Sequence, residues 1–398
     1  MDEAHRYDRR TVLKGTLAAA GGAALTGAIP GAARAEGGPD DPPESARARC
    51  RASGLRGRGV SYDTGFVIPG VTTTHEPFDP ELVKRDMRII RHDLNCNAVR
   101  VWGGVQDRLK IAATHAAHAG LEVWYGPFTT DLTAQQMLDF LAEAADHCER
   151  LRRQGHTVVL MLGAELSLMQ QGFFPGATWQ ARLAGFNPRN PAFLQALAQL
   201  PRRLNAFFAQ AVPLVRARFG GPISYGSLSF EGVDWTPFDY VGSDFYPNKV
   251  NGEYVGAVDA IASLESHGKP VAITEMGCPA FDGAAAIAGR AQSTVIDFSD
   301  PNGNLRVIGN PVRDEAEQAD YVTGLLELLD REGADSAFVY TFASRHLRGD
   351  LDIGSLGVVR ALPLGESGTT FPQVDWEPKE AFYAMADLYG KVRGRSGL

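Results

Sequence analysis

The chain has 398 residues, of which 44% are hydrophobic, 22% charged and 9% aromatic. This composition is ordinary for a globular protein and suffices for one large domain or two small ones. The formal net charge is -8 at pH 7 and no long Lys/Arg block follows the first residues, so nucleic acid is not expected as a partner.

The first 35 residues predict an export signal. Arg9 and Arg10 precede Thr-Val-Leu-Lys, an Ala- and Gly-rich stretch covers 15–33, and Ala-Arg-Ala at 33–35 offers a small-residue cleavage pattern. The segment resembles a twin-arginine signal, which implies the twin-arginine export machinery as a partner and a secreted or cell-envelope location. A permanent membrane anchor is the alternative. It is disfavoured because the stretch is Gly-rich and weakly apolar, so no stable membrane span is expected in the mature chain.

Residues 36–56 predict a flexible lead-in, because they are rich in Pro, Gly and Arg and lack a hydrophobic period. Residues 57–398 are expected to form one catalytic domain. An exported protein could contain one disulfide, whose pairing the sequence does not give. No metal or other cofactor is predicted, because no spacing typical of a zinc site occurs among the four cysteines, Cys50, Cys96, Cys148 and Cys278.

Short apolar runs alternate with amphipathic segments from residue 58 onward, a pattern typical of strands that return through helices to a parallel sheet. Helical spacing of apolar residues is clear around 82–90, 137–144 and 321–328. The eight predicted strands are Gly59–Tyr62, Ala98–Trp102, Leu121–Tyr125, Thr157–Leu162, Ile223–Tyr225, Tyr240–Ser243, Pro270–Thr274 and Ala337–Thr341.

Eight strand–helix units predict a closed α/β barrel, the (β/α)8 TIM barrel, as a single domain with elongated βα loops. Two long connections, 164–191 and 276–312, each follow a strand, on the side where such barrels carry their active sites. The alternative is an open doubly wound sheet. It would need a Gly-rich phosphate turn after the first strand, and residues 61–65 offer none.

Two glutamates stand at the carboxyl ends of predicted strands four and seven. Glu165 follows Val-Val-Leu-Met-Leu-Gly-Ala, and Glu275 follows Pro-Val-Ala-Ile-Thr. An acid that ends a buried strand is costly to desolvate unless it faces a polar site. Hydrolysis of a glycosidic bond with retention needs two carboxyl groups about 5 Å apart, one protonated and one ionised. We therefore predict that Glu165 and Glu275 are the catalytic pair.

The motifs around these residues resemble those of the clan A glycoside hydrolases, a group of retaining barrel enzymes. Residues 269–277, Lys-Pro-Val-Ala-Ile-Thr-Glu-Met-Gly, look very like the nucleophile strand of that clan. The resemblance implies that Glu165 is the acid/base and Glu275 the nucleophile. It also implies that Arg100, in Asn-Ala-Val-Arg-Val, braces the nucleophile, and that Tyr246, in Gly-Ser-Asp-Phe-Tyr-Pro, hydrogen-bonds to it.

The chain departs from the clan at two positions. Many members have Asn immediately before the acid/base, where this chain has Ala164. The sequence Gly-Ala-Glu-Leu at 163–166 is similar to that of β-mannanase-like members, which also lack the Asn. Where the clan often places a Trp after strand eight, this chain offers Tyr340 or Phe342.

Aromatic and acidic residues near strand ends are candidates for contacts with sugar. Apolar sugar faces stack on aromatic rings, and acids accept hydrogen bonds from hydroxyl groups, but core packing and helix capping are equally open interpretations. His346 could line the site, although a surface position is favoured. The candidates are Trp102, Trp124, Tyr125, Trp179, Trp235 and Tyr340 among aromatics, and Asp63, Asp131 and Asp244 among acids.

The leading hypothesis is a retaining glycoside hydrolase that acts on a β-linked oligosaccharide or polysaccharide, with a β-mannan or β-glucan as the best guess. The carbohydrate is thus the expected substrate. A transglycosylase on the same scaffold is an alternative, since it differs only in excluding water from the glycosyl-enzyme. A carbohydrate-binding barrel without catalysis is the third hypothesis, although a pure binder has no need for two facing carboxylates.

Overall fold

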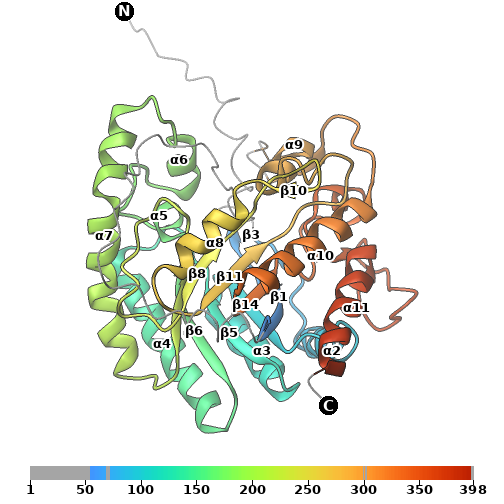
Figure 1. Cartoon of the computed structure of the whole chain (residues 1–398), viewed down its shortest axis with the longest axis horizontal. Helices are drawn as coiled ribbons and strands as arrows, with labels where there is room; N and C mark the ends of the chain where they lie inside the picture. Colours follow the sequence, from blue (N-terminus) through green and yellow to red (C-terminus); the bar gives the residue numbers. More distant parts are fainter. Residues whose placement is uncertain (1–53, 69–71, 299, 301–302, 396–398) are drawn as a thin grey trace, which may run out of the picture.

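The computed structural model describes residues 54–68, 72–298, 300 and 303–395. The predicted signal and most of the predicted lead-in lie outside these residues. The described chain forms a barrel of parallel strands surrounded by helices (Figure 1). Among the described helices, none combines the length and apolar character that a membrane crossing requires.

The barrel contains the eight strands predicted from the apolar runs. They pair in parallel in the order β7-β6-β5-β4-β1-β14-β11-β8, and a parallel bridge between Ser227 and Ser243 brings the two edges together. The predicted (β/α)8 fold is therefore confirmed. The strands are β1 (Gly57–Asp63), β4 (Ala98–Gly103), β5 (Glu122–Pro127), β6 (Val158–Ala164), β7 (Ile223–Gly226), β8 (Val241–Asp244), β11 (Val271–Met276) and β14 (Ser336–Val339).

Helices cover the outside of the barrel, and local signals fix where several of them begin. Asp79 caps α2 and is followed by Pro80, while Thr133 and Gln136 form a capping box at the start of α4. The helices are α2 (Pro80–His92), α3 (Gln106–His118), α4 (Ala134–Arg153), α5 (Leu166–Met169), α6 (Trp179–Ala184), α7 (Pro191–Arg216), α8 (Ala257–Glu265), α9 (Ala291–Val295), α10 (Glu315–Glu332) and α11 (Glu380–Arg395), with the 3-10 turns η1 (Ala288–Arg290) and η2 (Gly349–Gly354).

The expectation of a helix after every strand was wrong for the fifth unit. Residues 227–240 connect β7 to β8 without a helix. This connection packs on the long helix α7 instead: the Asn205 side chain donates to the Gly232 carbonyl at 3.0 Å, and the ring of Phe238 lies 5.1 Å from that of Phe208. Helix α7 has 26 residues and covers this part of the barrel.

The surplus chain gathers at the carboxyl ends of the strands, as predicted. The connection after β6 contains α5 and α6, and the connection after β11 contains η1, α9 and a hairpin. In Figure 1, α6 lies at the upper left and α9 at the upper right, both above the labels of barrel strands β8 and β11. Each hairpin follows a barrel strand: β2–β3 (Val67–Ile68 and Thr72–Thr73), β9–β10 (Lys249–Val250 and Glu253–Tyr254), β12–β13 (Ile296–Asp297 and Arg306–Val307) and β15–β16 (Val359–Ala361 and Trp376–Pro378).

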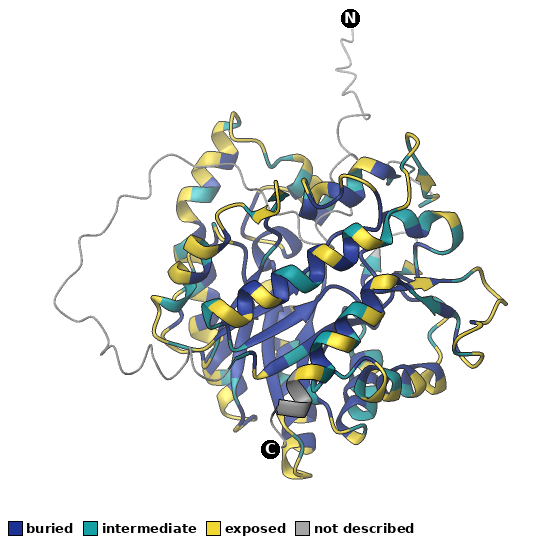
Figure 2. Cartoon of the chain, turned by 45° about the vertical axis from the view of Figure 1, so that its right-hand side comes forward, coloured by how far each residue is buried: buried dark blue, intermediate teal, exposed yellow. Residues whose placement is uncertain are grey.

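Two apolar cores stabilise this arrangement. The larger one lies between the barrel and its helices, and Figure 2 shows buried strands in the middle with partly exposed helices around them. The smaller one fills the inside of the barrel, where strand side chains pack in layers. Its members are Ala98, Trp124, Val159, Met161, Ala272 and Phe338.

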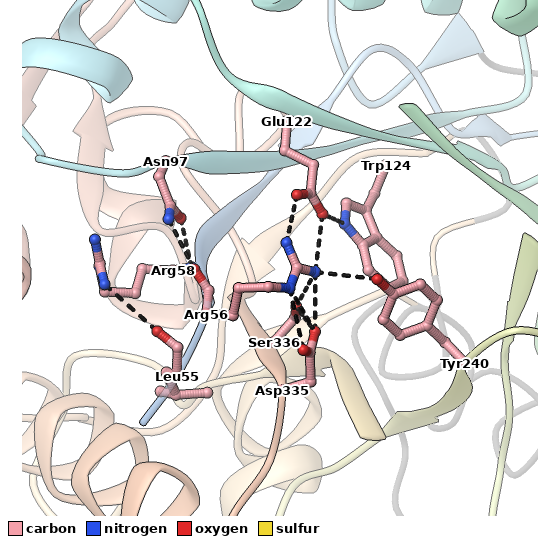
Figure 3. A network of polar contacts seen from close by, with 9 residues as sticks. All are labelled: Leu55, Arg56, Arg58, Asn97, Glu122, Trp124, Tyr240, Asp335 and Ser336. Carbon is pink, nitrogen blue, oxygen red and sulfur yellow. Dashed lines mark hydrogen bonds and ion pairs between the residues drawn. The ribbon is translucent and has the colours of Figure 1, made fainter. Parts of the chain in front are cut away.

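A polar cluster closes the amino-terminal end of the barrel (Figure 3). The guanidinium of Arg56 binds Glu122 at 2.5 Å and Asp335 at 2.9 Å, and also donates to the Tyr240 hydroxyl at 3.2 Å. Leu55 is buried beside it. The predicted boundary at residue 56 therefore lies slightly inside the folded part.

Trp124 belongs to this end of the barrel, so its prediction as a sugar platform was wrong. Its indole N–H donates to Glu122 at 2.7 Å. Its ring centroid lies 5.0 Å from those of Tyr240 and Phe338, and the side chain is fully buried. The Trp124 ring thus packs in the core.

Candidate active site

The barrel brings the two predicted glutamates into one buried site. Glu165 directly follows β6 and Glu275 is the last but one residue of β11. Their exposed fractions are 1% and 0%. Both glutamates extend directly from apolar strands, so the register of those strands sets how far along the barrel axis each carboxyl group lies.

Glu275 lies between two donors. The Arg100 guanidinium donates to Oε1 at 2.6 Å, and the Tyr246 hydroxyl donates to Oε2 at 3.0 Å. Both expected contacts are therefore present, and Arg100 and Tyr246 are themselves buried. Burial raises the pKa of Glu275 above its usual value, although the charge of Arg100 and the hydrogen bonds from both residues limit that rise. The direct ion pair with Arg100 favours the carboxylate anion.

Glu165 has the opposite environment. Within the described chain, neither of its carboxyl oxygens has a hydrogen-bond partner. Burial and then the negative charges of Asp244, Glu275 and Glu231 raise the pKa of Glu165 well above its usual range, and the charge of Arg100 opposes them. These surroundings favour the protonated form of Glu165.

The backbone at Glu165 turns sharply. Its φ of 47° and ψ of 36° are left-handed, a conformation that residues other than Gly, Asn and Asp seldom adopt. The Glu165 N–H donates to the Gly226 carbonyl at 2.9 Å, and α5 starts at the next residue. This turn sets the direction in which the side chain leaves β6.

Asp244 adds a third carboxyl group at the end of β8. It pairs in register with Glu275, and its Oδ1 accepts a hydrogen bond from Thr274 at 2.6 Å. Within the described residues its Oδ2 has no partner. Burial and then the charge of Glu275 raise the pKa of Asp244 well above its usual range, so the site holds more carboxyl groups than Arg100 alone can neutralise.

Glu231 is a fourth buried acid, which the sequence did not single out. It lies in the helix-free connection after β7 and is fully buried. Burial raises its pKa above the usual value, and hydrogen bonds from Ser167, Leu228 and Tyr225 limit that rise. No local pattern distinguishes this residue from a solvated loop acid, because its partners come from two different strand ends.

Two of the predicted aromatic residues lie beside the carboxyl groups. The rings of Trp102 and Tyr340 are 5.2 Å apart. Burial and the nearby charges of Glu275, Asp63 and Glu165 act on the Tyr340 hydroxyl and raise its pKa. Tyr340 therefore lies within electrostatic range of the carboxyl groups, and Trp102 packs on its ring.

The other sugar-contact candidates have structural contacts. Tyr125 packs on His147 of α4 and Trp235 packs on Phe238. Trp179 packs on Phe66 at 5.6 Å, and Phe66 in turn contacts Trp102.

Among the polar candidates, Asp131 forms an ion pair with Arg182 at 2.5 Å and the Asp63 side chain accepts from the Gly65 N–H at 2.7 Å. Burial and this hydrogen-bond environment leave the pKa of Asp63 at about 6. His346, for which a surface position was favoured, is half-buried, and burial lowers its pKa to about 4.

Neither metal ligands nor disulfides are seen in the part of the chain that the structure describes. Within those ranges, no group of three or more His, Cys, Asp and Glu could hold a metal ion. Cys96, Cys148 and Cys278 are buried as free thiols, and Cys50 lies outside the described residues.

A hollow of about 670 Å³ lies elsewhere on the molecule, between β13, η2 and β15. Its lining includes Arg313, Asp350 and Arg360, but none of the buried site carboxyls and no aromatic ring. Because sugar recognition commonly uses aromatic stacking, this hollow offers no support for sugar binding.

Comparison with known proteins identifies the fold. No family model matches the sequence, and no curated protein matches it. Among solved structures, a GH113 β-1,4-mannanase aligns over 84% of this chain and 99% of its own, with 14% identity and a TM-score of 0.54. The GH113 β-mannanase of Alicyclobacillus acidocaldarius aligns over 85% and 98%, with 12% identity and a TM-score of 0.51.

A β-glucuronidase from Bacteroides uniformis also aligns, over 84% of this chain and 34% of its own, with 12% identity and a TM-score of 0.52. The GH113 enzymes are members of the clan that the sequence motifs resemble. The fold implied by that resemblance is therefore confirmed. At these identities the likeness shows the fold alone.

Proposed function

We propose that this chain is a retaining glycoside hydrolase, with Glu165 as acid/base and Glu275 as nucleophile. The observation that carries the proposal is the unequal environment of the two buried carboxyl groups. Glu275 receives hydrogen bonds from Arg100 and Tyr246, while Glu165 has none within the described chain and faces other acids. Double displacement requires one protonated and one ionised carboxyl group in the same site.

The chemistry follows from these states. Glu165 gives its proton to the glycosidic oxygen while a carboxylate oxygen of Glu275 attacks the anomeric carbon, so the leaving alcohol departs as a glycosyl ester forms. Glu165, now ionised, then takes a proton from water, and the water oxygen attacks the same carbon and releases Glu275. Arg100 and Tyr246 hold the carboxylate in position throughout.

A β-linked oligosaccharide or polysaccharide, of β-mannan or β-glucan type, is the proposed substrate. Support comes from the fold shared with GH113 β-mannanases and from the Ala164-Glu165 sequence that resembles β-mannanase-like members. Trp102 and Tyr340 supply rings near the carboxyls, and Asp244 Oδ2 can accept a hydrogen bond from a sugar hydroxyl.

We further propose that the chain is exported by the twin-arginine route to the cell envelope or beyond. This rests on Arg9, Arg10 and the apolar stretch that follows them. The segment lies outside the described residues.

Kinetics on two kinds of leaving group test the acid/base assignment. Removal of Glu165 in Glu165→Ala should abolish most turnover of natural linkages, yet reduce the first step on dinitrophenyl glycosides much less, because an activated leaving group needs little protonation. The glycosyl-enzyme should accumulate, and the basic limb of the pH profile should flatten. An equal loss on both substrates with the basic limb retained would reject Glu165 as the acid.

A further inference from the structure

Hydrogen bonds link Glu231 to the backbone that directly follows Glu165. The Leu166 N–H donates to the Tyr225 hydroxyl oxygen at 2.8 Å, and the same hydroxyl donates to Glu231 at about 2.9 Å. The Ser167 N–H donates to Glu231 Oε1 at 3.2 Å. The N–H groups of the first two residues of α5 are therefore both hydrogen-bonded. Ser167 binds Glu231 directly, and Leu166 binds Tyr225, which in turn binds Glu231.

These contacts complete the anchoring of the left-handed turn at Glu165. Three consecutive N–H groups, from Glu165, Leu166 and Ser167, bind to β7 or to the connection that follows it. A non-Gly residue keeps a left-handed conformation only where its surroundings enforce it. The contacts from Tyr225 and Glu231 are thus part of what directs the Glu165 side chain.

The hydrogen bonds to Glu231 fit a negatively charged carboxylate. Tyr225, Ser167 and Leu228 all donate to it, and none of them requires a proton from it. None of these partners in the described chain is a cation, so no direct ion pair with them neutralises the charge of Glu231. That charge acts on Glu165 in the same direction as those of Asp244 and Glu275.

We propose that Glu231 is a positioning residue for Glu165, which holds the turn at the acid/base through Tyr225 and Ser167 and adds a negative charge to the acids around Glu165. The proposal rests on the catalytic role proposed for Glu165 above. Arg100 opposes this charge, while the acids Asp244 and Glu275 reinforce it. The Tyr340 hydroxyl also lies within electrostatic range of Glu165.

Glu231→Gln tests the charge and Tyr225→Phe tests the anchoring. Glu231→Gln should move the basic limb of kcat/KM to lower pH by about half a unit or more, because one negative neighbour of Glu165 is lost. It should also lower kcat on poor leaving groups by about tenfold. Tyr225→Phe leaves the Glu231 charge in place, so kcat should fall while the basic limb stays.

A direct titration separates this proposal from the catalytic one. Carbon-13 NMR of the full chain with labelled Glu carboxyls, with the Glu165 signal assigned from Glu165→Gln, should show a lower pKa for Glu165 in Glu231→Gln than in the wild type. This readout does not depend on turnover. A wild type that hydrolyses no glycoside would refute the proposed function, whereas an unchanged Glu165 titration would overturn the role of Glu231.

Glu149→Gln is the matched control, since Glu149 is another largely buried carboxylate but is bound at the end of α4 by Arg152 and Arg153. It should leave the Glu165 titration unchanged. If Glu231→Gln does not fold, Tyr225→Phe decides the proposal. Full retention of kcat on poor leaving groups in that variant would overturn it, because a purely structural hydroxyl would alter only thermal stability.

Discussion

Replacing Glu165 by Gln should stabilise the folded chain, increasingly as the pH rises. Glu165 is buried without a hydrogen-bond partner in the described chain, and burial, followed by the neighbouring acids, raises its pKa above the ordinary value of 4.5. Above pH 4.5 the unfolded chain releases this proton while the folded chain retains it. Wild-type stability therefore falls as pH rises, until Glu165 ionises in the folded state as well.

The size of the effect follows from proton linkage. The wild type loses up to about 1.4 kcal/mol for each pH unit over which only the unfolded chain is ionised at this position. Gln does not titrate, so the variant escapes this loss. A gain of 1 kcal/mol corresponds to roughly 2 °C in Tm for a domain of this size.

Urea denaturation of both proteins between pH 4 and pH 8 measures the difference in free energy of unfolding. It should be small near pH 4 and grow in favour of Glu165→Gln above that. Glu149→Gln should behave in the opposite way, because hydrogen bonds from Arg152, the Gly220 N–H and Arg153 lower the pKa of Glu149, so that its ionised form stabilises the fold. A Glu165→Gln advantage that does not change with pH would refute the reasoning.

Three further outcomes are expected. Arg100→Met breaks the buried ion pair with Glu275, so the free energy of unfolding should fall by about 3–5 kcal/mol. The acid limb of the pH–rate profile should also move to higher pH. An unchanged denaturation midpoint would contradict this prediction. Arg56→Ala should lower stability by only about 1 kcal/mol, since its side chain is 43% exposed, and should leave kcat of the folded enzyme unchanged in initial-rate assays. Residues 1–40 fused to a folded reporter should carry it across the membrane, and changing Arg9 and Arg10 to Lys should stop the crossing; continued crossing would point to another type of signal.

The fold could be predicted because each barrel strand has an apolar sequence of its own. Parallel strands are covered on both faces, so runs such as Val158–Ala164 are apolar almost throughout. The sequence was less informative about connections. Residues 227–240 lack a helix because α7 already covers that side, and this coverage depends on packing between segments far apart in the chain.

The site could be predicted where function lies at the end of a strand. Glu165, Glu275 and Arg100 have strand neighbours that fix their position along the barrel. Trp124 was misplaced because the strand period shows that its side chain points into the barrel but not how far along the barrel axis it lies. It lies near the start of β5, whereas Trp102 lies near the end of β4. Glu231 was missed because its role depends on hydrogen bonds to Tyr225 and Ser167 rather than on any local pattern.

Mechanism-based labelling tests the central claim most directly. The protein would be incubated with 2-deoxy-2-fluoro glycosides of manno and gluco configuration that carry an activated leaving group, digested, and analysed by peptide mass spectrometry, with Glu275→Gln as the control. We expect one glycosyl ester, on Glu275, in the wild type and none in the control. A label on Asp244 or Glu165 instead, or equal labelling of the control, would contradict the assignment of Glu275 as the nucleophile.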